Sequence, residues 1–204
     1  MVSLLGVPQV RCHEKYLGLP CYSGKNKHGL FSSIKDRVWN KLCSWKSKLL
    51  SMGGREVFSK AVVQAIPAYT MNLFKIPFTL IKKLHRLCAQ FWWGGEPEKR
   101  RMHWCTWEKL CSHKFDGGMG FLDLRLFNRS ILAKQAWRIH THPMSLAARV
   151  LQGFYFHNSS FLQVKVNFSS SFVWRSILWG RELYKQGLRC KIGSGQDTYI
   201  YHDC

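Results

Sequence analysis

The stretch FTLIKKLHRLCAQFWW, residues 78–93, has the hydrophobic spacing of an amphipathic helix. Its apolar residues recur at steps of three and four, which places them on one face of a helix. These residues are Leu80, Ile81, Leu84, Leu87, Cys88 and Phe91. Pro77 precedes the stretch, where a proline suits the start of a helix. Lys82, Lys83 and Arg86 fall off the apolar face. The pattern therefore predicts a helix that buries one side and presents cations on the other.

Two preceding stretches predict similar helices. In the first, residues 31–49, the apolar stripe consists of Phe31, Ile34, Val38, Leu42, Trp45 and Leu49. In the second, residues 55–66, the residues predicted to face inward are Val57, Phe58, Ala61, Val62 and Ala65. Gly53 and Gly54 end the first helix, and Pro67 ends or kinks the second. Three amphipathic helices with short connections predict a small bundle over residues 31–93.

The other segments give a mainly α fold class with one β element. Residues 1–30 have the pattern of extended and loop structure. Residues 94–187 are predicted to be a helical connection region, with helices near 106–111 and 124–140, from Ser145, and over 171–187. Two β-type runs around Gly193 and Gly195 predict a C-terminal β-hairpin at residues 188–204.

The charge indicates a polyanionic partner. The chain of 204 residues holds 31 Lys and Arg against 11 Asp and Glu, a net charge of +20. Twenty of the basic residues lie within residues 1–115. Nucleic acid is the partner that such a field favours, as RNA, DNA or an RNA–DNA hybrid. No apolar run reaches the ~18 residues that a membrane-spanning helix needs, so no membrane partner is expected.

The candidate nucleic-acid-binding residues are cations on the first and third predicted helices and in the loop after the third. They are Lys35, Arg37, Lys41, Lys46, Lys48, Lys82, Lys83, Arg86, Lys99, Arg100 and Arg101. Cations of this kind contact phosphates, and nearby aromatic rings can stack on bases. The alternative for any single one of them is a merely solvated basic face. Packing in a core is favoured over base stacking for Trp92, Trp93, Trp104 and Trp107.

Metal and catalytic sites are less well supported. His103, Cys105, Cys111 and His113 have the residue types of a zinc site. They lack the CxxC spacing that is usual in structural zinc sites, so burial of the cysteines is favoured. The chain contains no pair of adjacent aspartates of the kind that two-metal polymerase chemistry would suggest. We therefore expect no metal site, no cofactor and no catalytic residues.

Several strings, in order along the chain, resemble one family. They are YLGLP (16–20), IKDRVWNKLCSWKSKLLSMGGRE (34–56), QAIPAYTMNLFKIP (64–77), FWWGGEPEKRRMHW (91–104), GGMGFLDLRLFN (117–128), LAKQAWR (132–138) and WRSILWGRELYKQGLRCKIGSG (174–195). The chain resembles the part of plant LINE-type (non-LTR) retrotransposon polyproteins that follows the reverse transcriptase palm. It is also similar to short plant reading frames, including mitochondrial ones, derived from such elements.

The resemblance implies a role for each segment. In such polyproteins the catalytic Tyr-x-Asp-Asp motif lies upstream of YLGLP, so residues 1–30 would be a lead-in from a missing palm. Residues 31–93 would be the thumb, which grips the template and primer. Residues 94–187 would be the connection, and residues 188–204 would lead to an absent zinc-binding module. Leu122 departs from the family, which usually has an arginine after GGxGF, so contact with nucleic acid is less expected in the second half.

Together these observations predict a non-catalytic fragment of a LINE-type reverse transcriptase. It would bind RNA or DNA electrostatically without sequence specificity, and the missing palm is a further candidate partner. The alternative is an inert retroelement relic or truncated gene model without independent activity. Eight scattered cysteines and the lack of a signal-peptide pattern predict a reduced, intracellular protein. The nucleus or cytoplasm is favoured over the mitochondrion.

Overall fold

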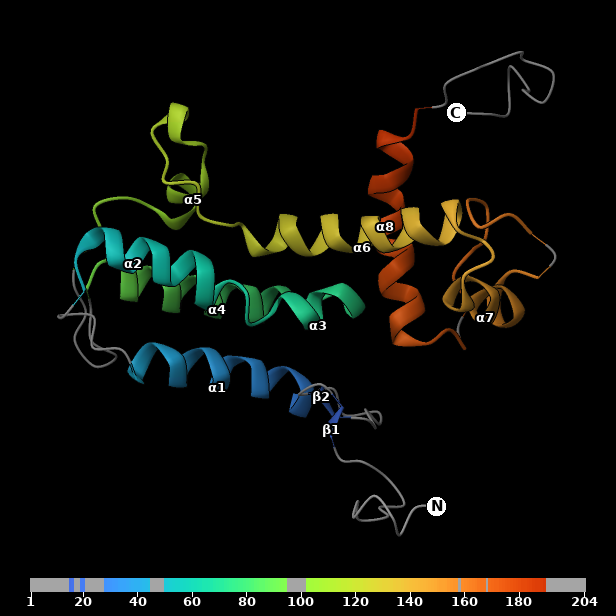
Figure 1. Cartoon of the computed structure of the whole chain (residues 1–204), viewed down its shortest axis with the longest axis horizontal. Helices are drawn as coiled ribbons and strands as arrows, with labels where there is room; N and C mark the ends of the chain where they lie inside the picture. The colour runs from blue at the N-terminus through green and yellow to red at the C-terminus, as the bar shows by residue number, and fades with distance from the viewer. Residues whose placement is uncertain are drawn as a thin grey trace, which may run out of the picture. The chain divides into compact units, whose positions relative to one another are not determined.

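The structure is a computed structural model, in which the chain is mainly helical (Figure 1). The described residues are 15–16, 19–20, 28–44, 50–94, 102–157, 159–167 and 169–189. Among them, the strands β1 (Lys15–Tyr16) and β2 (Leu19–Pro20) form a short antiparallel pair. None of the described helices has the length and apolar character required to span a bilayer. The mainly α prediction is confirmed for this part of the chain.

The chain packs as two compact units. The first unit comprises residues 1–70 and 79–107, and the second comprises residues 71–78 and 108–204. The helices of the first unit are α1 (His28–Ser44), α2 (Met52–Phe58), the π-helical turn η3 (Ser59–Val63) and most of α4 (Phe78–Trp92). The short helix α3 (Ala68–Leu73) contains the boundary between the units. The predicted segment borders at residues 30, 93 and 187 remain predictions.

Helix α4 has the apolar face that its sequence predicts. Leu80, Ile81, Leu84, Cys88 and Phe91 are buried, and Leu87 is half-buried. Burying side chains of this size contributes roughly 1.5–3 kcal/mol each relative to exposure. The three cations Lys82, Lys83 and Arg86 are exposed, as predicted. The spacing of three and four therefore identified both faces of this helix.

Of the inward face predicted for residues 55–66, Phe58 is buried and Val62 is half-buried, but the prediction is wrong for the other three residues. Val57 is 66% exposed, and Ala61 and Ala65 are exposed as well. For Ala61 and Ala65 the cause is the π-helical turn η3, in which the Gln64 backbone amide donates to the Ser59 carbonyl, five residues earlier, at 3.0 Å. A π turn holds more residues than an α turn, so it rotates every later side chain around the helix axis. As a result Ser59 and Val63 are buried instead.

The second unit is built around two long crossing helices. Its helical elements are α5 (Trp107–Cys111), the 3₁₀ turn η4 (Lys114–Asp116), α6 (Leu124–Thr141), α7 (Leu146–Tyr155) and α8 (Phe172–Gly187). Side-chain caps begin the last three helices: Asp123 accepts from two amides of α6, Ser145 from Ala148, and Ser171 from Trp174. The helix predicted from Ser145 is confirmed, and Ser145 is its N-cap. Such caps contribute about 1 kcal/mol each.

An aromatic cluster fills the core of the second unit. Trp174 is 1% exposed, and the rings of Tyr155 and Phe156 lie almost parallel to it at centroid distances of 4.8 and 5.6 Å. Phe161 packs edge-on at 6.0 Å. Aromatic pairs in these geometries add about 0.5–1.5 kcal/mol beyond the area they bury. The cluster connects α8 to α7 and to the loop that follows α7.

Helices α6 and α8 cross (Figure 1). Gly180 of α8 lies against the α6 backbone at Leu132 and Ala133. A Cβ atom on this residue would lie 2.6 Å from the amide nitrogen of Ala133 and nearer still to the backbone of Leu132. Distances below 3.0 Å do not occur between a Cβ and backbone atoms without a shift of one of them. Glycine is therefore required for the two backbones to approach this closely.

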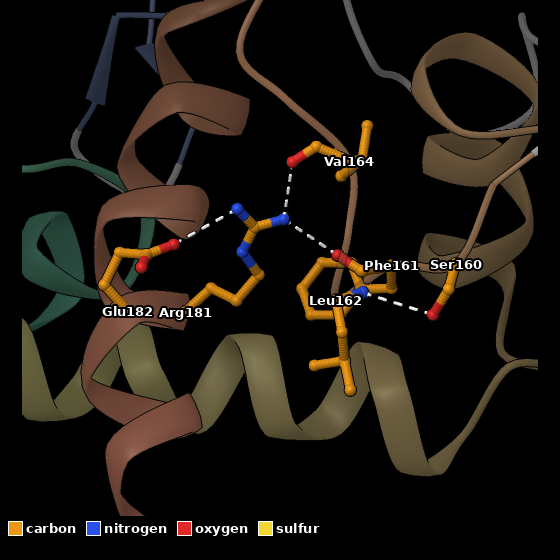
Figure 2. A network of polar contacts seen from close by, with 6 residues as sticks. All are labelled: Ser160, Phe161, Leu162, Val164, Arg181 and Glu182. Atoms are coloured by element: carbon orange, nitrogen blue, oxygen red, sulfur yellow. Dashed lines mark hydrogen bonds and ion pairs between the residues drawn. The ribbon is translucent and has the colours of Figure 1, made fainter. Parts of the chain in front are cut away.

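Arg181, the next residue, ties α8 to the loop at residues 160–164 (Figure 2). Its Nη1 donates to the Phe161 carbonyl at 2.9 Å and to the Val164 carbonyl at 2.7 Å. Its Nη2 lies 3.1 Å from the Glu182 carboxylate. Arg181 is only 7% exposed, so a charge is buried here with two carbonyls and one carboxylate as partners. The loop has no helical hydrogen bonds of its own at these carbonyls, and Arg181 supplies them.

The predicted C-terminal β-hairpin requires correction. The strands that the structure describes lie at residues 15–16 and 19–20, far from residues 188–204 in sequence. Helix α8 ends at Gly187, and Leu188 and Arg189, the described part of the predicted hairpin, form no strand. Residues 190–204 lie outside the described part of the chain. Short runs of alternating residues are weak signals, because an isolated two-stranded hairpin is only marginally stable.

Candidate nucleic-acid interface

Six of the eleven predicted contact residues lie in the described part of the chain. The other five, which lie outside it, are Lys46, Lys48, Lys99, Arg100 and Arg101. The six described residues are Lys35, Arg37 and Lys41 on α1 and Lys82, Lys83 and Arg86 on α4. All six are exposed, and both helices belong to the first unit. These side chains are therefore accessible from solvent.

An open groove between α1 and α4 brings three of these cations together. It has a volume of about 470 Å³. Helix α1 lines it with Lys35, Asp36 and Trp39, and helix α4 lines it with Lys83, Arg86 and Leu87. Lys35 and Trp39 are one turn apart and share a face of α1, as Lys83 and Arg86 do on α4. The groove therefore combines cations from two helices that are far apart in the sequence.

The groove has the chemistry of a phosphate-binding surface. It contains three cations against the single carboxylate of Asp36, so its charge is positive. The guanidinium group of Arg86 can bind a phosphate through two parallel N–H donors, while the ammonium groups of Lys35 and Lys83 act as point charges. Trp39 is half-buried and offers an apolar surface for a sugar or base. The arrangement selects for a phosphate backbone and has no evident means of reading a sequence.

The remaining described cations lie elsewhere. Lys41 borders a second groove of about 530 Å³, whose other lining residues are Leu50, Gly53, Gly54, Val57, Phe58, Ala61 and Val62. That groove is predominantly apolar. Arg37 and Lys82 line neither of these two grooves. The structure thus divides the predicted set, and Lys35, Lys83 and Arg86 form its concentrated part.

Trp39 had no role in the sequence analysis. The available signal was its position, because it falls outside the stripe of Phe31, Ile34, Val38 and Leu42 while sharing a helix face with Lys35. An aromatic residue beside a cation on the outer face of an amphipathic helix indicates contact with a ligand or a neighbouring helix rather than with the helix's own core.

The four tryptophans predicted to pack do not share one environment. Trp92 and Trp107 are buried, at 4% and 7% exposure, and Trp93 is half-buried with its ring stacked on His103 at 6.2 Å. Trp104 is 80% exposed, so the prediction of packing is wrong for this residue. The spacing of Trp104 and Trp107 would suit one helix, but α5 begins only at Trp107. Trp104 therefore lies before the helix rather than on its buried face.

The four residues considered as zinc ligands in the sequence are distributed over both units. His103 and Cys105 belong to the first unit, and Cys111 and His113 to the second. Within the described residues, no group of three or more His, Cys, Asp or Glu side chains gathers around one point. Burial raises the pKa of the Cys111 thiol to about 12, and the negative charges of Asp123 and Glu108 add to this effect. Cys111 therefore stays protonated near neutral pH, which disfavours it as a metal ligand.

Fold and groove together define a class: a mainly helical, strongly basic protein with a cation-lined surface groove. The chain is similar to an uncharacterized mitochondrial protein of Arabidopsis thaliana, with 43% identity over 140 residues. The matched region covers 68% of this chain and 91% of that protein. The chain belongs to the same family as this mitochondrial protein.

A second relative in Arabidopsis thaliana is much longer. Its name describes it, provisionally, as a ribonuclease H protein, and it is 32% identical over 190 residues. The match covers 91% of this chain but only 30% of that protein. Both relatives are consistent with a retroelement-derived sequence. No protein-family model matches the chain, and no solved structure does.

Proposed function

We propose that the chain binds the phosphate backbone of RNA, DNA or an RNA–DNA hybrid through the α1–α4 groove, without sequence specificity. The observation that carries the proposal is that Lys35, Lys83 and Arg86 line one groove together with the half-buried Trp39. The net charge of +20 supports it. So does the name of the longer relative, which refers to a ribonuclease.

The proposed mechanism is electrostatic. Each cation that contacts a phosphate releases condensed counterions, so the affinity falls as salt rises. Three contacts on a duplex would contribute about −2.7 to the slope of log K against log salt concentration. If the chain derives from a LINE-type reverse transcriptase, this groove corresponds to the thumb surface that grips the template and primer. That assignment is part of the proposal and rests on the resemblance of residues 34–56 and 91–104.

The test is a titration of fluorescein-labelled RNA–DNA hybrid with the full chain at 50 and 200 mM salt. The triple variant Lys35→Gln/Lys83→Gln/Arg86→Gln should bind about 10- to 100-fold more weakly at the lower salt concentration and show a shallower salt slope. The matched control is Lys134→Gln/Arg149→Gln/Lys165→Gln, which removes the same charge from exposed positions of the second unit. Equal losses in both triple variants would mean that net charge alone, and not the groove, binds the hybrid.

We propose further that the chain does not catalyse DNA synthesis by itself. The support is chemical, because the sequence contains no adjacent pair of aspartates. A primer-extension assay with the purified chain should give no product, and any template-dependent product would overturn this part of the proposal. The competing hypothesis of an inert relic requires that the hybrid titration show no binding at 50 mM salt.

The proposed location is intracellular. The mitochondrial name of one relative belongs to that protein. For this chain, the name adds the mitochondrion to the nucleus and the cytoplasm as a candidate compartment. Microscopy of the full chain carrying a C-terminal fluorescent tag would distinguish these compartments.

A further inference from the structure

A buried asparagine holds the segment at residues 71–78 inside the second unit. Asn128 of α6 is fully buried, and its Nδ2 donates to the carbonyls of Met71 and Phe74 at 2.9 and 3.0 Å. Its Oδ1 accepts from the Ile76 amide at 3.0 Å. One side chain thus satisfies three backbone groups that belong to no regular helix ladder. The segment is fixed against α6 by directional bonds rather than by apolar contact alone.

Helix α8 fixes the same segment from another side. The Ser176 hydroxyl oxygen accepts from the Lys75 amide at 2.9 Å and donates to the Phe172 carbonyl at 2.7 Å. The rings of Phe74 and Phe172 stack at 5.4 Å with an interplanar angle of 17°. The backbone of Lys75 is therefore held in one position relative to α8. Its side chain extends from a rigid base.

Two cations approach the ring of Trp179 on α8. The Nζ of Lys75 lies 4.6 Å from the ring centroid, and the Cζ of Arg129 on α6 lies 5.8 Å from the same point. Attraction to the ring's π-electrons holds each cation in place. The two charges are then within roughly one Debye length of each other, ~10 Å at 0.1 M salt, so they repel each other. An anion bound beside either cation would offset this repulsion.

The surroundings add further positive charge. Arg125 lies one turn before Arg129 on α6, and Arg175 lies one turn before Trp179 on α8, and both are exposed. Residues at this spacing share a helix face. Within the described part of the chain, neither Lys75 nor Arg129 forms an ion pair.

The nearby carboxylates are already engaged. Asp123 accepts from the Arg125 and Leu126 amides as the cap of α6, at 2.8 and 3.4 Å. Glu182, three residues after Trp179, pairs with Arg181 at 3.1 Å. Within the described residues, neither of these carboxylates forms an ion pair with Lys75 or Arg129.

We propose that Lys75, Arg129 and Trp179 form a second nucleic-acid contact, in which the two cations bind backbone phosphates and the Trp179 ring orients them. This inference rests on the proposed function and extends it to the second unit, where the sequence favours contact less. A phosphodiester backbone fits because it presents repeated anions to cations that are already positioned. An acidic peptide is the competing ligand class, and the experiment separates the two.

The experiment uses the full chain and a fluorescein-labelled 20-nucleotide oligothymidylate, followed by fluorescence anisotropy at 50 and 200 mM salt. The double variant Lys75→Gln/Arg129→Gln should bind about tenfold more weakly at 50 mM salt. Its salt slope should be shallower by about 1.4, which corresponds to two lost contacts on a single strand. The control Lys165→Gln/Arg149→Gln removes one lysine and one arginine from exposed positions and should change the affinity less than twofold.

Two further variants keep the test decisive if the double variant unfolds. Lys75→Gln alone leaves the backbone bond to Ser176 intact and should weaken binding about threefold. The charge-preserving Lys75→Arg should retain the parent affinity within twofold. Circular dichroism of each variant at the assay temperature establishes that folded protein is being compared.

The outcomes separate this inference from the proposed function. Binding by the parent chain that is unchanged in Lys75→Gln/Arg129→Gln overturns the inference and leaves the α1–α4 groove standing. Absence of binding by the parent chain overturns both. If the double variant loses affinity for labelled polyglutamate but keeps its affinity for the oligonucleotide, the site binds acidic peptide and the inference is wrong.

Discussion

The crossing of α6 and α8 and the groove between α1 and α4 use cationic side chains in opposite ways. At the crossing, Arg181 is buried and donates to two carbonyls of one loop (Figure 2). In the groove, Lys35, Lys83 and Arg86 are exposed beside a single carboxylate. A buried charge must have its partners within the fold, since water cannot supply them. An exposed charge is free to exchange water for a ligand.

The comparison shows that cations counted in the same net charge can serve either the stability of the fold or the binding of a ligand. Arg181 contributes to the net charge of +20 as much as Lys83 does, yet it is committed to the loop at residues 161–164. Net charge therefore overstates the number of cations that can contact a ligand. The predictions that follow test whether the two regions are as separate as their geometry indicates, from the largest expected effect to the smallest.

The largest effect is expected for Gly180→Ala at the helix crossing. The added methyl group would overlap the backbone of α6 at Leu132 and Ala133, and relief requires the helices to separate. We expect a loss of about 3 kcal/mol in the free energy of unfolding, measured by urea denaturation. Gly153→Ala on α7 is the matched control, because its methyl group would meet no atom within 4 Å. That variant should gain roughly 0.5–1 kcal/mol, and equal behaviour of the two would contradict the close crossing.

Arg181→Met should be the next most damaging change. It keeps much of the side-chain volume but leaves the carbonyls of Phe161 and Val164 without their donor. Each buried carbonyl left unpaired costs about 1–3 kcal/mol, so we expect a total of about 2–3 kcal/mol after partial hydration of the loop. Thermal unfolding measures it, with exposed Arg149→Met as the control. Oligonucleotide affinity of the folded Arg181→Met protein should be unchanged, and a tenfold loss would place Arg181 in the binding surface after all.

The reverse experiment removes exposed charge from the groove. Lys83→Gln/Arg86→Gln should lower the affinity for the RNA–DNA hybrid by about tenfold at 50 mM salt. Its free energy of unfolding should stay within about 0.5 kcal/mol of the parent value, as is usual for exposed positions. A drop in the melting temperature of several degrees would show that these cations also stabilise the helix pair.

The smallest effect is a difference in cysteine reactivity with pH. Cys43 is exposed, whereas burial raises the pKa of the Cys111 thiol from 9.0 to about 12. The thiolate is the reactive form, so iodoacetamide should label Cys43 much faster than Cys111 at pH 8–9. The folded state retains the Cys111 proton between pH 9 and 12 and the unfolded state loses it, so this group lowers stability as pH rises through that window. Peptide mass spectrometry after timed labelling measures the ratio, and equal rates at pH 8.5 would contradict the raised pKa of the half-buried Cys111 thiol.

Local patterns predicted some features of the helices correctly, although Gly53 and Gly54, predicted to end the first helix, lie inside α2. The apolar face of α4, the cap at Ser145 and the end of α8 at Gly187 follow from spacing, capping and glycine placement alone. The same reasoning failed for Ala61 and Ala65, because the π turn that follows α2 changes the number of residues per turn. A periodicity argument assumes one helix type throughout. It has no means of anticipating such a turn.

The roles of single polar residues were out of reach for a different reason. Asn128 and Arg181 stand within helix patterns as ordinary polar positions, and nothing adjacent in sequence marks them as buried. Their partners at Met71, Phe74 and Phe161 are between 20 and 57 residues away. Only a folded chain brings those carbonyls within hydrogen-bonding distance. The pair of cations at Trp179 was not predicted from the sequence for the same reason.

The sequence by itself determined the helical class, the positive charge and the cations that face away from the core. These properties depend on composition and on spacing within a turn or two, where the geometry of a helix is known in advance. Tertiary structure alone decided which cations meet. Lys35 joins Lys83 and Arg86 across a groove, Arg181 is buried, and Lys75 meets Arg129 at one ring. The physical reason is that burial and charge proximity depend on how distant segments pack, and a linear pattern contains no direct record of those distances.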